Sequence, residues 1–191
     1  MVTFRGERRS NQTYLSTTDP DAKLANKGNG TAAMAGYTVN GLMGNRHRVL
    51  LGINIESFRE PASEIEGARD LLDTFHEKHA LRIQTVGADK GYFSKPFLTA
   101  LFRRRIQPHI ATKTTGREIV HQRVRQMSRT AGYHLSQRAR KKIEELWGEA
   151  KCWHSFRRFQ RSGLLQVRDD AYLIDWLLKL KRLEKLLPVP A

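Results

Sequence analysis

The stretch LRIQTVGADKGY, residues 81–92, decides the fold that the sequence predicts. Apolar and polar residues alternate over 81–84, which is the period of a half-buried strand. Gly87 and Gly91 then bracket Asp89, so we expect the strand to end before this carboxylate. Open α/β sheets place ligand and metal groups at the carboxyl ends of their strands. Asp89 is therefore a candidate metal ligand, although its position also suits an aspartate that only forms a turn.

The rest of the chain alternates between strand and helix periodicities and predicts an α/β domain. Ser94 is expected to cap a helix whose first turn tolerates Pro96. The expected strands are 37–43, 49–55 and 107–110, and the expected helices are 61–79, 94–105, 136–151 and one that opens at Asp169. The last helix carries an apolar stripe that we expect to pack in the core, with a partner surface as the alternative. The stripe consists of Leu173, Trp176, Leu177, Leu180, Leu183 and Leu187.

Charge is distributed very unevenly along the 191 residues. Residues 1–89 hold 11 basic and 11 acidic side chains, whereas residues 90–191 hold 23 basic and 8 acidic ones and carry the whole net charge of +15. One-sided positive charge favours a nucleic-acid partner over a merely solvated basic surface. The only cysteine, Cys152, excludes a disulfide framework. Because neither a signal peptide nor a long apolar run is visible, we expect a cytoplasmic protein.

Residues 112–133 form a basic segment, which we expect to be an irregular or partly helical insertion. Glu118 is the one acidic residue of this segment. Salt-sensitive contacts with a nucleic-acid backbone are expected from its cationic side chains. The candidates are Arg123, Arg125 and Arg129.

Glu144 is the second candidate carboxylate and lies in the helix expected over 136–151. Gln137, Arg140 and Lys151 stand seven before, four before and seven after it, which places all four side chains on one helical face. Alone, the pattern is typical of routine surface ion pairs. Combined with an aspartate at a strand end, it indicates two carboxylates that share divalent metals, beside cations that hold phosphates.

Both motifs resemble those of bacterial insertion-sequence DDE transposases. The run GADKGY, residues 87–92, resembles the motif around that family's second catalytic aspartate. Arg140, Glu144 and Lys151 match the spacing of its Tyr-Arg-Glu-Lys signature. Gln137 replaces the tyrosine of the signature, which is a departure from the family.

The resemblance implies an RNase H-like mixed sheet with flanking helices, in which Asp, Asp and Glu hold two Mg²⁺ or Mn²⁺ ions. It implies cleavage of double-stranded DNA at transposon ends and transfer of the freed ends to target DNA. Asp89 and Glu144 are then the implied catalytic metal ligands, and Arg140 and Lys151 the implied DNA contacts. A homodimer that works at the nucleoid is also implied.

The first aspartate of the family has no clear counterpart, because no strand that ends in Asp-Gly-Thr is visible. Asp19 and Asp21 lie in a Thr-Thr-Asp-Pro-Asp turn, and we interpret them as turn formers. We therefore expect a polar leader over 1–36 and, over 37–187, an RNase H-like domain that lacks its first strand and is inactive without the missing N-terminal part. Two alternatives stay open: a non-catalytic DNA-binding regulatory fragment, and an RNase H-like nuclease.

Overall fold

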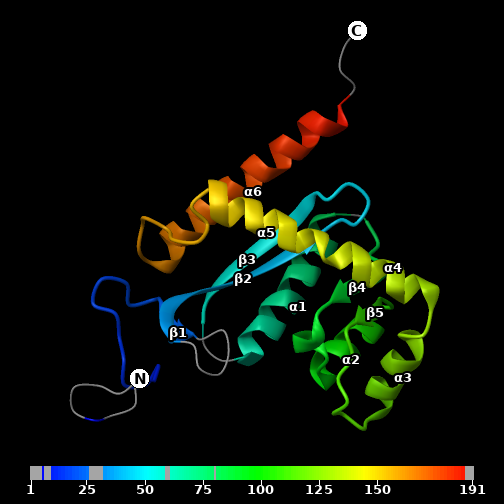
Figure 1. The fold of residues 1–191 in the computed structure, drawn as a ribbon. Coiled ribbons are helices and arrows are strands. Elements are labelled where there is room, and N and C mark those ends of the chain that lie inside the picture. Colours follow the sequence, from blue (N-terminus) through cyan, green and yellow to red (C-terminus); the bar gives the residue numbers. More distant parts are fainter. Residues whose placement is uncertain (1–5, 7–9, 26–31, 59–60, 80, 188–191) are drawn as a thin grey trace.

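Helices and strands alternate in the computed structural model, which confirms the α/β class (Figure 1). The model describes residues 6, 10–25, 32–58, 61–79 and 81–187; the other parts of the predicted leader lie outside the described residues. The elements are β1 (Lys23–Ala25), β2 (Met34–Met43), β3 (Leu50–Ser57), α1 (Pro61–Lys78), β4 (Thr85–Ala88), α2 (Lys95–Arg103), β5 (Gln107–Ile110), α3 (Ile119–Met127), α4 (Ala131–Arg140), α5 (Lys142–Trp153) and α6 (Leu164–Leu186).

The strands β2 and β3 form the antiparallel hairpin that the sequence predicts. Ile53 and Ile55 of β3 are buried in a core cluster with residues of α5 and α6. On the other face of the same strand, Gly52 lies against Leu71 of α1. The hairpin is therefore covered on both faces, and β1 extends it by pairing with the first residues of β2.

The second sheet contains β4 and β5, which pair in parallel, and it corrects the start of the strand that was predicted to begin at Leu81 and to end before Asp89. Thr85 lies opposite Gln107, and Ala88 lies opposite Ile110. Leu81 is 65% exposed, whereas Ile110 is fully buried. Pairing with the buried β5 thus begins the strand four residues later than the alternation predicts, while its end before Asp89 and the strand at 107–110 are confirmed.

The helix predicted over 136–151 is two helices, α4 and α5, which meet at Lys141. Thr130 starts α4 earlier than expected, because its hydroxyl accepts a hydrogen bond from the amide of Tyr133 at 3.3 Å. The break directs the two helices to different sheets (Figure 1). The first packs on β4 and β5, while Leu146 and Ala150 of the second join the core of the hairpin.

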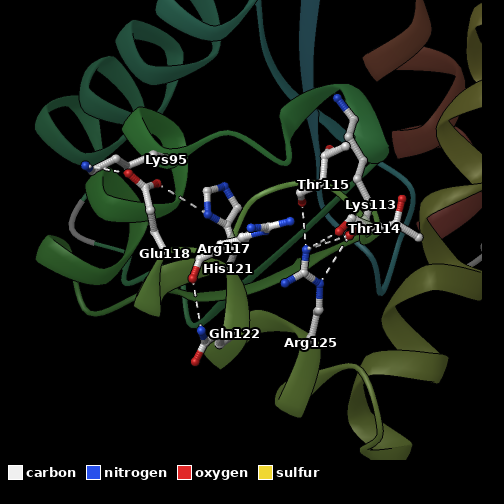
Figure 2. A network of polar contacts seen from close by, with 9 residues as sticks. All are labelled: Lys95, Lys113, Thr114, Thr115, Arg117, Glu118, His121, Gln122 and Arg125. Atoms are coloured by element: carbon white, nitrogen blue, oxygen red, sulfur yellow. Dashed lines mark hydrogen bonds and ion pairs between the residues drawn. The ribbon is translucent and has the colours of Figure 1, made fainter.

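The basic segment 112–133 is partly helical, as expected, and contributes to the core. Its helix α3 packs on α2 and β5, with Val124 fully buried. Arg125 donates hydrogen bonds of 2.7–3.2 Å to the backbone carbonyls before this helix (Figure 2). These carbonyls belong to Lys113, Thr114 and Thr115. The guanidinium carbon of Arg125 also lies 5.4 Å from the centre of the Phe93 ring.

Replacing Arg125 with alanine is expected to lower the free energy of unfolding by about 2 kcal/mol, because several carbonyls lose a charged donor at once. Chemical denaturation measures the change. Arg129→Ala is the matched control, since this exposed arginine ends the same region and should change stability by less than about 0.5 kcal/mol. Equal losses in the two variants would show that the carbonyl contacts do not stabilise the fold.

The last helix, α6, begins at Leu164 rather than at Asp169. Asp21 accepts a hydrogen bond from the Leu164 amide at 2.9 Å, and Asp19 accepts one from the Gly163 amide at 3.2 Å. Unpaired amides at a helix start favour such carboxylates. The two aspartates therefore stabilise the start of α6, which accords with a structural role for both.

The expectation that the apolar stripe of α6 packs in the core is wrong. Leu173 and Trp176 are 63% and 64% exposed. The residues that face the core are instead Val167, Ala171 and Leu178, which lie on the opposite side of the helix. Because both sides of α6 are apolar, its periodicity does not decide which side packs.

Candidate active site

Asp89 directly follows β4, as predicted, and its side chain is exposed. It starts a short 3₁₀ turn, η1 (Lys90–Tyr92), in which its Oδ1 accepts a hydrogen bond from the Gly91 amide at 2.7 Å. This bond holds the carboxylate at the end of the strand. The other oxygen, Oδ2, has no hydrogen-bond or ion-pair partner among the described residues.

Gln137 connects α4 to the two strand ends beside this carboxylate. Its Nε2 donates hydrogen bonds to the carbonyl of Ala88, at 3.2 Å, and to the carbonyl of His109. Its Oε1 accepts a hydrogen bond from Nε of Arg140 at 3.2 Å. One amide thus fixes the ends of β4 and β5 and orients an arginine. The spacing argument placed Gln137 on this face but did not predict its role.

Glu144 lies in the first turn of α5, and its side chain is 65% exposed. Nη1 of Arg140 lies 3.3 Å from Oε1 of Glu144. The predicted pairing of the two residues therefore survives the break at Lys141. Lys151 is also exposed, two turns further along α5, and it does not line the cleft that contains the other three predicted site residues.

A cleft of about 290 Å³ brings Asp89, Arg140 and Glu144 together. It is bounded by β2, β4, α1 and α5. In the described part of the chain, β2 pairs with β1 only up to Gly36 and otherwise with β3, while β4 pairs only with β5. The strand edges at the cleft are thus unpaired. Its apolar lining includes Val39, Leu42, Leu72, Val86, Ile143 and Trp147.

Two contacts that the sequence did not predict join the walls of the cleft. The hydroxyl of Tyr92 donates a hydrogen bond to Oδ1 of Asn40, on β2, at 3.0 Å. The indole of Trp147 lies on β2 at Gly41, where a Cβ would stand only 2.3 Å from the ring. Tyr92 belongs to the GADKGY motif, which was the available signal for the first contact.

The carboxylates of Glu64 and Asp89 lie near each other beside the cleft. Burial raises the pKa of Tyr92, and the charges of Glu64 and Asp89 raise it further. Partial desolvation and the charge of Asp89 likewise raise the pKa of Glu64, although that side chain is largely exposed. A cation would relieve this repulsion. Carboxylates suit Mg²⁺ or Mn²⁺ by donor type, but the described residues contain no group of three His, Cys, Asp or Glu side chains that could hold a metal ion.

A second cavity, more open and of about 300 Å³, adjoins the first through Arg140. Its lining includes Arg138, Lys141 and His134. Arg138, Arg140 and Lys141 thus lie side by side on a concave surface, which favours phosphate groups. The sequence argument missed Arg138 and Lys141, because it followed only the face of Glu144.

The fold and the site place this chain among α/β proteins with a polar site at the end of a parallel strand. The family model described as the transposase DDE domain matches residues 9–177. The chain belongs to this family, in agreement with an insertion-sequence DDE transposase. No curated protein and no solved structure shows significant similarity to it. Among the helices described, none combines the length and apolar character that crossing a membrane requires.

Proposed function

We propose that this chain is part of the RNase H-like catalytic domain of an insertion-sequence transposase, which cleaves DNA and joins the ends when its acid set is complete. One observation carries the proposal: Asp89 and Glu144, which are far apart in sequence, line one cleft together with Arg140. Family membership supports DNA transposition as the reaction. The natural setting is the nucleoid, with transposon ends and target DNA as substrates.

The residues of the cleft have distinct proposed roles. Asp89 and Glu144 would hold Mg²⁺ or Mn²⁺ through carboxylate oxygens. Divalent ions held there would supply Lewis-acid chemistry for phosphodiester cleavage by activating a water and stabilising developing charge on oxygen. Arg140 orients Glu144 and holds phosphate oxygens beside it. Lys151 contacts the DNA backbone further along α5.

The proposal includes one further strand, which fills the cleft between β2 and β4. Within the described residues, both of these strands present unpaired edges there, and most of the lining between them is apolar. Such edges accept an added strand through main-chain hydrogen bonds. An acid on that strand, next to Asp89, would complete the three carboxylates. Without it the chain is expected to bind DNA and not to cleave it.

Two other functions predict different results in the same assays. A non-catalytic regulatory fragment binds DNA but gains no cleavage when the strand is supplied. A general nuclease cleaves but does not transfer the freed 3′-hydroxyl to a second duplex. A strand-transfer assay with Mg²⁺ and a cleaved DNA end therefore separates the three functions.

Replacing Arg138 and Lys141 together with glutamine should reduce the slope of log affinity for duplex DNA against log salt by about 1.8, because each lost phosphate contact removes about 0.9. Fluorescence anisotropy over a salt series measures the slope. The matched control replaces Arg103 of α2 and Lys185 of α6 with glutamine, which removes the same amount of positive charge from other helices. An unchanged slope would exclude the basic cavity from the DNA-binding surface.

Arg123, Arg125 and Arg129 remain predicted DNA contacts of the basic segment. Arg125 is engaged with backbone carbonyls, and the guanidinium carbon of Arg123 lies 4.6 Å from the centre of the Phe102 ring. Arg123 and Arg129 are both exposed, whereas Arg125 is half-buried.

A further inference from the structure

The loop of residues 113–117 leaves the carboxyl end of β5 at the same edge of the sheet as Asp89. The amide of Ala111 donates a hydrogen bond to the carbonyl of Ala88 at 3.0 Å, so the chain is still paired with β4 just before the loop. Asp89 follows Ala88 directly. Because neighbouring parallel strands lie about 4.8 Å apart, the loop starts beside this carboxylate.

Arg125 orients three successive peptide units of this loop. Its Nη2 donates hydrogen bonds to the carbonyls of Lys113, Thr114 and Thr115 at 2.9, 3.2 and 2.7 Å (Figure 2). No described peptide bond is cis. In a trans peptide the carbonyl and the amide point in opposite directions. The amides of Thr114, Thr115 and Gly116 are therefore directed away from Arg125.

These three loop amides are suited to an anion. Among the described residues, none of the three amides has a hydrogen-bond partner. Thr114 and Thr115 are exposed and add two hydroxyl donors. Successive amides that point to one side form a concave, positively polarised surface, which binds phosphate and similar anions. The guanidinium of Arg125 thus creates an anion site on the side of the loop opposite to itself.

The charges around the loop also favour an anion. Lys113 and Arg117 are exposed, and within the described part of the chain neither has an ion-pair partner. Glu118, the one acidic residue of the basic segment, pairs with Lys95 at 2.7 Å. Cationic side chains beside free amides can hold a phosphate through charge-assisted hydrogen bonds.

The far end of the loop is fixed by a close contact. Gly116 has a φ of +91°, a conformation that favours glycine. A Cβ at this position would stand 2.9 Å from the buried ring of His121. That ring packs on Phe93, with the ring centres 4.9 Å apart. Because the loop is held by Arg125 and by His121, a ligand does not have to order it on binding.

We propose that residues 113–117 form a phosphate-binding loop, in which Lys113, Arg117 and the three loop amides contact a phosphate group. Arg125 is the positioning residue of this loop, so its predicted contribution to DNA binding is indirect. The identity of the ligand rests on the proposed function, which supplies two sources of the same chemistry. One is a phosphodiester of the DNA backbone, and the other is the 5′-phosphate that remains when cleavage frees a 3′-hydroxyl.

A titration of the isotope-labelled full chain with inorganic phosphate, followed by NMR, tests the loop without DNA. The three loop amides should shift together and saturate. Replacing Lys113 and Arg117 together with glutamine should weaken this binding by about tenfold or more, because charge-assisted contacts are lost. The control replaces Arg103 and Lys185 with glutamine and should weaken it by less than about twofold. Loop amides that do not respond, or equal losses in the two double variants, overturn the proposal.

Arg125→Lys separates positioning from direct contact. Lysine keeps the charge but lacks the planar fork that gathers several carbonyls. A positioning role therefore predicts that the three loop amides lose their common response, whereas a direct contact predicts that most of the phosphate affinity is kept. Arg129→Lys is the control, and amide signals outside residues 112–125 report whether the fold is intact. A full response in Arg125→Lys overturns the positioning role, and the Lys113 and Arg117 double variant tests the loop even if Arg125→Lys unfolds.

Duplexes that end in a 5′-phosphate or a 5′-hydroxyl distinguish the two sources of phosphate. For a terminal phosphate, wild type prefers the phosphorylated end, and the Lys113 and Arg117 double variant loses that preference alone. For a backbone phosphodiester, the double variant binds both duplexes more weakly by the same factor. Unchanged binding of both duplexes overturns the assignment of the loop to DNA. A chain that binds inorganic phosphate at the loop but no DNA would instead contradict the proposed function and leave the loop site in place.

Discussion

Supplying an extended strand that fills the cleft between β2 and β4 is expected to convert an inactive chain into a Mg²⁺- or Mn²⁺-dependent DNA-cleaving domain. Two ions repel each other and need enough carboxylate charge around them. Asp89 and Glu144 alone supply little, since Arg140 neutralises part of it. A strand with alternating apolar residues and an aspartate placed next to Asp89 should bind the cleft and complete the acid set.

The experiment joins the strand in cis or adds it as a peptide and follows two signals. Thermal unfolding reports whether the strand binds, because a ligand of the native state raises the unfolding temperature. Cleavage of a labelled duplex reports the chemistry. Asp89→Asn and Glu144→Gln should keep the stabilisation and lose the cleavage, and a strand with asparagine in place of its aspartate should behave in the same way.

Cleavage of DNA by the chain without an added strand would contradict this prediction. If it cleaves DNA without an added strand, and Asp89→Asn removes the cleavage, then the third carboxylate is already present. Asp19 and Asp21 would be poor candidates, since both accept hydrogen bonds at the start of α6. Glu64, whose pKa responds to the charge of Asp89, would be the first residue to replace.

Local chemistry made several elements predictable from sequence. The hairpin of β2 and β3 follows from two alternating runs around a turn, and the helix after Ser94 follows from an apolar period. Ser94 stands at the N-cap position as predicted, but its hydroxyl makes no capping hydrogen bond among the described residues. The pairing of Arg140 with Glu144 follows from a spacing of four residues. Each of these signals lies within one short segment.

The elements that were misplaced depend on partners far along the chain. The strand at 85–88 contains Gly87 and Ala88, whose small side chains give no strand period, and it is fixed by β5. The break at Lys141 was not predicted because no glycine or proline marks it in the sequence. It occurs where the two helices diverge to pack on different sheets. The apolar row of α6 was assigned to the core because periodicity records that a side is apolar and not what covers it.

Gly87→Val is expected to destabilise the chain by about 3 kcal/mol. Strand propensity alone would predict the opposite effect, because valine is a better strand former than glycine. At this position α4 lies so close to β4 that a Cβ would stand 2.8 Å from Oγ of Ser136 and 3.4 Å from its backbone oxygen. The added methyl groups must push α4 away. That shift would stretch the bonds of Gln137 to the strand ends and move Arg140 from the cleft.

Two further variants separate this contact from the general effect of replacing a glycine. Gly148→Ala lies in α5 with no neighbouring atom within 4 Å of its Cβ, so it should stabilise the chain by about 0.5–1 kcal/mol. Ser136→Ala removes the nearer oxygen, which is buried without a hydrogen-bond partner, so it should be close to neutral alone and restore part of the stability of Gly87→Val. Strict additivity of the Gly87 and Ser136 changes in urea unfolding would show that the contact between α4 and β4 is not the cause. The loss would then originate within the strand itself, and the site beside Asp89 would not depend on how closely α4 packs.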